Sequence, residues 1–422
     1  MTFPLTDPSK EGNVVQHSAA QVINDPNCET RALQREFGWE AKTVVLGAGV
    51  MLALAFGALL PVLPQIEAAL SRGPQDSFLI KQLFGIVGLS IVIGAPLAGF
   101  LVDRVGVRII VTVAGLVICI AGTAGLYVNS LPVLVGSRML LGIAAGAIDT
   151  TSVAIINTRL HGNERAKWNG TRIAVTLICS VIMQPTVGYI AQFGWRAPFA
   201  VYTLGLPLGL IGAFALKNER LPRECVAAIQ KEARFRDWFP FRYALLALVL
   251  GIMTYLPVVY GPFLMRQRGV SSPVTISLVL MGTSTIGAVS SMLYGPFRRN
   301  LSIEGAFTFS LAWWGAGTLI AALTPTFTGA VIGLLVGFVG YGWVVPNLMT
   351  AVGESVALSQ QGRAVGLVRT MHELAAPACI VLVEPVAKKF GPDIAIMISS
   401  ILAIGMLAVF ARKIALGKHV RA

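Results

Sequence analysis

The chain has 422 residues, of which 55% are hydrophobic and only 13% are charged, and its mean hydropathy is +0.73. A soluble globular domain carries about 25% charged residues, so this chain has too little charge to cover a water-facing surface. The net charge of +13 lies mostly in short segments between apolar runs, which is typical of membrane-protein loops and argues against nucleic acid as a partner.

Apolar runs of about 18 residues or more recur along the whole chain, and each is long enough to cross a hydrocarbon core of about 30 Å as a helix. The strands of an outer-membrane barrel would instead give short segments of alternating polarity. We therefore expect an all-α integral membrane protein with twelve transmembrane helices. The predicted spans are 43–63, 79–102, 108–128, 131–157, 168–191, 197–216, 242–263, 274–296, 303–324, 327–349, 365–387 and 393–412.

The distribution of basic residues predicts the orientation. The first 42 residues are polar, carry both signs of charge and lack the pattern of a cleaved signal peptide, so we place this end in the cytoplasm. Lys and Arg then number 23 in the cytoplasmic segments and 7 in the outer ones, the asymmetry typical of the positive-inside rule. We expect a multi-pass protein of the cell (inner) membrane with both termini in the cytoplasm.

The longest cytoplasmic loop, from Lys217 to Arg242, holds seven basic residues and separates six spans from six. This loop predicts two six-helix bundles. The expected organisation is an N-terminal tail at 1–42, a first bundle at 43–216, a linker at 217–241, a second bundle at 242–412 and a C-terminal tail at 413–422.

An internal repeat supports the division into two halves. A shift of 196 residues aligns Leu60-Pro61-Val62 with Leu256-Pro257-Val258, Gly99 with Gly295, Gly146 with Gly342, and Gly170 with Gly366. Because one register serves four places between the first and the eleventh span, we interpret the halves as parallel repeats. Transporter folds built in this way bind their solute at the interface between the repeats.

A short loop after the second span carries the strongest local motif. Residues 99–108 read GFLVDRVGVR, which resembles the loop signature of the major facilitator superfamily. The resemblance extends over about residues 41–412 and implies two six-helix bundles that rock around a midplane site. It also implies that Gly99, Asp103, Arg104, Gly106 and Arg108 form a gating loop on the cytoplasmic side. The alternative interpretation is a tight turn whose basic residues serve only to set the orientation of the protein in the membrane.

Span 4 contains Arg138-Met139-Leu140-Leu141-Gly142, which resembles the R-x-x-x-G pattern that this family links with proton coupling. In a helix, Arg138, Gly142, Gly146 and Asp149 form one stripe, and the two charges lie about 16 Å apart along the axis, too far to pair. Glycines at this spacing favour close helix packing. An ionisable group within a span costs at least about 2.5–3.5 kcal/mol, so Arg138 and Asp149 are candidates for proton coupling.

Span 11 contains Arg369, His372 and Glu373. Arg369 and Glu373 are spaced for an i,i+4 ion pair, which would be structural. A carboxylate in a dry environment can take up a proton near neutral pH, so His372 and Glu373 are further candidates for proton coupling. Glu384 lies near the outer end beside Pro385, and there we expect an interfacial position.

Four residues are candidates for contact with the substrate. Arg172, about a turn into span 5, can bind an anion, with snorkelling to the cytoplasmic face as the alternative. Tyr255, Tyr341 and Asn347 lie in spans 7 and 10. Core packing and interface anchoring explain most residues of this kind, so the assignment rests on their position alone.

These features predict a secondary active transporter of a small organic solute that works by alternating access. Efflux in exchange for protons is the favoured mode. Residues 184–189 resemble a proton-antiporter signature, of which only Pro185 and Gly188 are retained. The alternatives are proton-coupled uptake of an organic anion held by Arg138 or Arg172 and, from another class, a polytopic membrane enzyme or sensor.

The sequence contains no P-loop, no dinucleotide fingerprint and no credible metal motif, and its five cysteines are widely scattered. We therefore expect neither an enzyme nor a cofactor or metal. The expected partners are the small-molecule substrate, protons and membrane lipid, and the expected state is a monomer.

Overall fold

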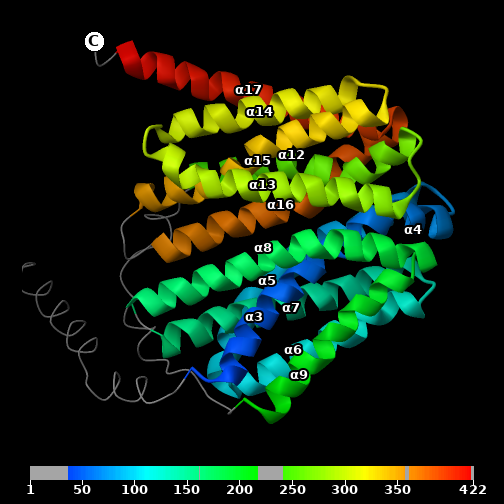
Figure 1. The fold of residues 1–422 in the computed structure, drawn as a ribbon, viewed down its shortest axis with the longest axis vertical. Coiled ribbons are helices and arrows are strands. Elements are labelled where there is room, and N and C mark those ends of the chain that lie inside the picture. The colour runs from blue at the N-terminus through cyan, green and yellow to red at the C-terminus, as the bar shows by residue number, and fades with distance from the viewer. Residues whose placement is uncertain (1–36, 161, 217–240, 357–360, 420–422) are drawn as a thin grey trace, which may run out of the picture.

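The structure is a computed structural model that describes residues 37–160, 162–216, 241–356 and 361–419. Within these ranges all regular secondary structure is helical (Figure 1). Twelve helices in the described part are long and apolar enough to cross a membrane. The predicted fold class is thereby confirmed, while the linker predicted at 217–241 lies outside the described residues except for its last one.

The first half contains the helices up to Phe214. Its elements are α3 (Trp39–Gly57), η1 (Leu60–Val62), α4 (Leu63–Leu70), α5 (Pro74–Val105), α6 (Val107–Gly122), η2 (Thr123–Leu126), α7 (Leu131–Arg159), α8 (Gly162–Ile190), η3 (Ala191–Phe193), η4 (Ala197–Leu204) and α9 (Gly205–Phe214).

The second half contains six long helices. They are α12 (Phe241–Gln267), α13 (Pro273–Arg298), α14 (Ile303–Leu323), α15 (Phe327–Ser355), α16 (Gln361–Phe390) and α17 (Pro392–His419). In Figure 1 the two halves lie one above the other. Their main helix contacts are between α5 and α16 and between α8 and α13.

The first span is longer than predicted. Its helical path continues past residue 63 to Leu70, after a break at Gly57 and a short 3-10 turn at Leu60–Val62. Pro61 and Pro64 each stand in the first turn of a new helical segment, where a missing N–H costs nothing. The polar residues Gln65 and Glu67 ended the apolar run in the sequence, although the helix goes on.

The repeat register is visible in the packing of the helices. A Cβ added to Gly146 would lie 2.6 Å from the carbonyl oxygen of Ile91, and one added to Gly342 would lie 2.4 Å from that of Gly287. Both residues of the second contact are 196 positions after those of the first. The expected packing role of these glycines is therefore confirmed, and equivalent helices approach each other at equivalent points in the two halves.

Most buried apolar clusters belong to one half, but one cluster joins both. It includes Leu63 and Leu83 of the first half and Phe263 and Ile380 of the second half. This cluster lies where α4 is found and where α12 and α16 end, and we call this the α4 end of the molecule. The two halves are packed together there.

The glycine contacts give a stability prediction. Gly146→Ala and Gly342→Ala should each lower the free energy of unfolding by about 1–3 kcal/mol, because the new methyl group meets backbone atoms of a neighbouring helix. Thermal unfolding of the purified protein measures this. Gly170→Ala and Gly366→Ala are matched controls, since no atom lies within 4 Å of the added Cβ. Equal losses in all four variants would contradict the prediction.

Candidate functional site

Asp149 and Arg172 form an ion pair between α7 and α8, and their side chains are 20% and 9% exposed. The sequence named them as separate candidates, one for proton coupling and one for anion binding. Pairing offsets the cost of placing each charge within a span. Since α8 also packs against α13 of the second half, a change in this pair can be passed to the interface between the halves.

Arg138 lies elsewhere, fully buried against the end of α6. Its Nη2 donates to the carbonyl oxygens of Ala121 at 2.9 Å and Gly122 at 2.7 Å. Its guanidinium also lies over the rings of Phe199 and Tyr202, with centroid distances of 5.2 and 4.8 Å. A cation at the last carbonyls of a helix is favourable. These contacts support a structural role for Arg138, and its part in proton coupling stays a prediction.

Glu373 lies on α16 and accepts a hydrogen bond of 2.7 Å from the hydroxyl group of Tyr255 on α12. The i,i+4 pair with Arg369 does not form, and the Arg369 side chain is exposed. Among the ion pairs recorded for the described residues, none includes Glu373. This carboxylate is thus held by a neutral donor.

Aromatic side chains pack around Tyr255, the residue that donates to this carboxylate. The Tyr255 ring lies 5.4 Å from that of His372 and 6.0 Å from that of Phe84, which in turn lies 5.9 Å from Phe56. His372 is 5% exposed, and its Nε2 has no hydrogen-bond partner in the described part of the chain. We call Phe56, Phe84, Tyr255, His372 and Glu373 the Glu373 site.

The Glu373 site lies between the two halves. Phe56 and Phe84 come from α3 and α5, whereas the other three residues come from α12 and α16. A Cβ added to Gly88 of α5 would lie 3.1 Å from the carbonyl oxygen of Glu373, so the two backbones approach closely here. This is the position that the repeat architecture predicts for a solute site.

The other substrate candidates fall in two places. Tyr341 lies 5.7 Å from Trp314 and 5.3 Å from Phe338, ring to ring, and is close enough to Glu373 for an electrostatic interaction. Asn347 instead bonds to the hydroxyl group of Tyr294 and the carbonyl oxygen of Ile303, both at 3.0 Å, inside the second half. The structure therefore brings Tyr341 to the site and leaves Asn347 in a helix contact.

The predicted gating loop forms the turn from α5 to α6. Gly106 has φ 89°, a conformation that favours glycine, and no atom lies within 4 Å of a Cβ added to Gly99. Arg108 donates to the carbonyl oxygen of Ala213 in the last turn of α9, and exposed Arg104 lies 4.0 Å from the ring of Phe100. The Asp103 side chain lies outside the described residues, so its part in the gating loop stays a prediction.

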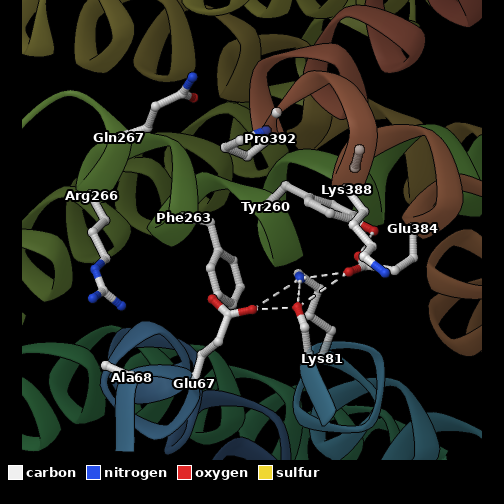
Figure 2. A pocket seen from close by; sticks show the side chains of 13 residues that line it. Glu67, Ala68, Lys81, Tyr260, Phe263, Arg266, Gln267, Glu384, Lys388 and Pro392 are labelled. Atoms are coloured by element: carbon white, nitrogen blue, oxygen red, sulfur yellow. Dashed lines mark hydrogen bonds and ion pairs between the residues drawn. The ribbon is translucent and has the colours of Figure 1, made fainter. Parts of the chain in front are cut away.

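The interfacial position expected for Glu384 is wrong. Glu384 is 4% exposed and its Oε1 pairs with Lys81 Nζ at 2.8 Å, while Tyr260 donates to its Oε2 at 2.7 Å (Figure 2). Sequence reasoning missed Lys81 as a functional candidate. The available signal was a lysine inside an apolar run, since such a charge needs a partner.

A family model for the Major Facilitator Superfamily matches residues 45–379, and the chain belongs to this superfamily of membrane transporters. Among curated relatives, multidrug resistance protein MdtL of Shewanella sp. (strain ANA-3) is 25% identical, over 62% of this chain and 66% of that protein. Quinolone resistance protein NorA of Staphylococcus aureus (strain MSSA476) is 23% identical, over 77% of this chain and 84% of NorA.

The chain spans just under two thirds of the length of the MdtL relative, at 66%. The solved D-xylose-proton symporter has a TM-score of 0.72 to this chain at 13% identity, covering 89% of this chain and 97% of the symporter. The fold is therefore shared. Relatives and structural neighbours alike are transporters, so the alternative class of membrane enzyme or sensor is set aside.

The contacts of Arg138 predict a loss of stability when it is replaced. Arg138→Met keeps an unbranched side chain only as far as the position of Nε and removes the donors to the α6 carbonyl groups, and should lower the free energy of unfolding by about 1.5–3 kcal/mol. Thermal unfolding measures the effect. Arg412→Met, at an exposed position on α17, is the control and should change stability by less than about 0.5 kcal/mol. A stable Arg138→Met protein without transport would instead support a coupling role.

Proposed function

We propose that the chain exports a small organic solute across the cell (inner) membrane by alternating access and in exchange for protons. In this proposal it acts as a monomer, both termini lie in the cytoplasm, and residues 217–241 link the two bundles. The names of MdtL and NorA, which refer to drug resistance, support export. The name of the symporter supports proton coupling.

The observation that carries the proposal is the Glu373 site. Among the described residues Glu373 has no ion-pair partner. It lies between the halves and accepts a hydrogen bond from Tyr255, whose ring packs against those of Phe84 and His372. A negative charge beside aromatic faces is the chemistry that attracts an organic cation, with about 0.5–2 kcal/mol from each cation–π contact. We infer that the solute is a lipophilic amine or another organic cation.

The same carboxylate can couple the solute to protons. Ionised Glu373 holds the cation, and a proton that binds its carboxylate oxygen cancels the charge and weakens the hold on the solute. The hydroxyl group of Tyr255 donates a hydrogen bond to the ionised form and keeps the carboxylate oriented. Proton and solute thus compete for one group, which is what exchange requires.

Asp149 and Arg172 are the second element of the proposal. A proton on Asp149 would break the ion pair and leave Arg172 without its partner, so the contact between α7 and α8 changes. Uptake of an organic anion held by Arg138 or Arg172 has less support, because Arg172 already pairs with Asp149 and Arg138 Nη2 already donates to two carbonyl oxygens.

Glu373 gives the direct test. In proteoliposomes with a pH gradient, Glu373→Gln should lower the initial rate of transport of ethidium, a fluorescent organic cation, by at least about tenfold, because the variant keeps the size but not the charge. Glu373→Asp should keep part of the activity. Glu354→Gln removes a carboxylate that is 56% exposed and pairs with Arg298, and should transport like the wild type.

Two results would oppose this assignment. Normal ethidium transport by Glu373→Gln would remove Glu373 as the coupling group. If the wild type moved labelled benzoate, an organic anion, and left ethidium unmoved, the uptake alternative would replace export of cations.

The Asp149–Arg172 pair gives a separate prediction, in which the effects of substitution on stability and on transport differ. Asp149→Asn leaves Arg172 buried without its partner and should lower the free energy of unfolding by about 3–5 kcal/mol. The double variant Asp149→Asn with Arg172→Gln should recover most of that stability but not the proton-driven transport. Thermal unfolding and proteoliposome assays on the same samples measure both. Recovery of transport together with stability would show that the pair is only structural.

A further inference from the structure

A buried ion pair crosses the boundary between the two halves at the α4 end. Lys81 belongs to α5 and Glu384 to α16; their side chains are 8% and 6% exposed, and Nζ lies 2.8 Å from Oε1. By contrast, the pairs Asp149–Arg172 and Arg298–Glu354 each stay within one half. The Lys81–Glu384 pair therefore breaks when the halves separate at this end.

Each partner has a second contact within its own half. Within the first half, Lys81 Nζ lies 2.8 Å from the hydroxyl oxygen of Ser77 and 3.5 Å from Oε1 of Glu67. Across the boundary, its ammonium group also lies 4.7 Å from the ring centroid of Phe263 on α12. Glu384 keeps the hydrogen bond from Tyr260 of α12. Figure 2 shows Lys81 between the two carboxylates. After separation, Lys81 can keep its contact with Glu67, and Glu384 can keep its hydrogen bond from Tyr260. Neither charged group is then without a polar partner.

The cluster occupies the route between the Glu373 site and the α4 end. A cavity of about 540 Å³ at this end is lined by Gln267 at the end of α12, by exposed Lys388 near the end of α16, and by Lys81 of α5 and Glu384 of α16. On α16, Glu384 stands eleven residues after Glu373, about 16 Å along the axis and on nearly the same face. Along α16, the ion pair therefore lies between the Glu373 site and the exposed Lys388 that lines the cavity.

The neighbouring contacts hold the same end closed. Arg266 of α12 donates to the carbonyl oxygen of Pro64 at 2.5 Å, and Gln82 of α5 donates to that of Pro377 on α16 at 3.3 Å. Both bonds also cross between the halves. The charged groups that face the pair are thus Glu67 from α4 and Arg266 from α12, with Lys388 at the rim.

We propose that Lys81 and Glu384 are the gate that closes the α4 end, and that Glu67 receives Lys81 when the gate opens. The proposal rests on the alternating access proposed above. Ser77 and Tyr260 are positioning residues, since they hold the ammonium and the carboxylate in place while the pair is exchanged.

The gate can be tested by accessibility. Ile380, one turn from Glu384 on α16, is fully buried, and its Cδ1 would lie 2.9 Å from a Cβ added to Gly85 of α5. Ile380→Cys in a background with the five native cysteines changed to Ser is the reporter. A membrane-impermeant maleimide, added from the α4 side of sealed vesicles, labels this position only when the gate is open.

Lys81→Glu and Glu384→Lys should each raise the labelling rate by about tenfold. Each change places like charges in contact and so destabilises the closed state, which raises the population of the open state, a minor state in the wild type. The double variant with both changes restores opposite charges and should return the rate to near the wild-type value. Arg298→Glu, which breaks an ion pair inside the second half, is the matched control and should not change labelling. A thermal melt of each variant verifies folding.

Unchanged labelling in both folded single variants would overturn the gate, whatever the transport rates. The role of Glu67 is tested separately. Glu67→Gln should slow ethidium transport, while the labelling rate of Ile380→Cys stays as low as in the wild type. Normal transport by this variant would overturn the transfer of Lys81 from Glu384 to Glu67. If labelling follows the prediction but the wild type moves no solute in a pH gradient, the proposed function fails and the gate stands.

Discussion

The structure depends on one constraint: a charge inside a membrane helix must have a partner, because an isolated one costs several kcal/mol. Three such charges of the first half satisfy it in three ways. Arg138 binds the last carbonyl groups of α6, Arg172 pairs with Asp149 on the adjacent helix, and Lys81 pairs with Glu384 across the boundary between the halves. The partner lies at the end of a neighbouring helix for Arg138, on an adjacent helix for Arg172 and in the other half for Lys81, and this last contact is the one that we propose closes the α4 end.

Helices α12 and α16 combine the proposed binding site and the proposed gate in one unit. Tyr255 donates to Glu373, and Tyr260 donates to Glu384, with the same distance of 2.7 Å in both contacts. The helices can lie this close because Gly251 has no side chain, and a Cβ there would meet the carbonyl oxygen of His372 at 2.8 Å. The two carboxylates thus share a scaffold, so a tilt of α16 relative to α5 acts on both of them.

Much of the fold could be predicted from the sequence, since span number and repeat register depend on hydropathy and glycine spacing, which are local. The pairing of charges could not. Asp149 and Arg172 were recognised singly, and their contact depends on the rotation of two helices about their axes. Lys81 and Glu384 lie 303 positions apart, so neither indicates the other in one sequence. Position near the outer end of the span predicts an interfacial Glu384, whereas the helix directs its carboxylate inward to Lys81.

The repeat makes the gate asymmetric. A shift of 196 residues carries Lys81 to Ser277 and Glu384 back to Gly188, and these two residues also meet across the halves, where a Cβ added to Gly188 would lie 2.0 Å from the hydroxyl oxygen of Ser277. The pseudo-symmetric contacts at the α4 end are thus a charged pair on one side and a close contact of small residues on the other. Small residues permit tight packing that changes little when helices tilt, whereas an ion pair gains or loses a partner. The α8–α13 contact thus has no charge to exchange, and the close approach of Ser277 is the physical reason for a glycine at position 188 of the antiporter-like segment.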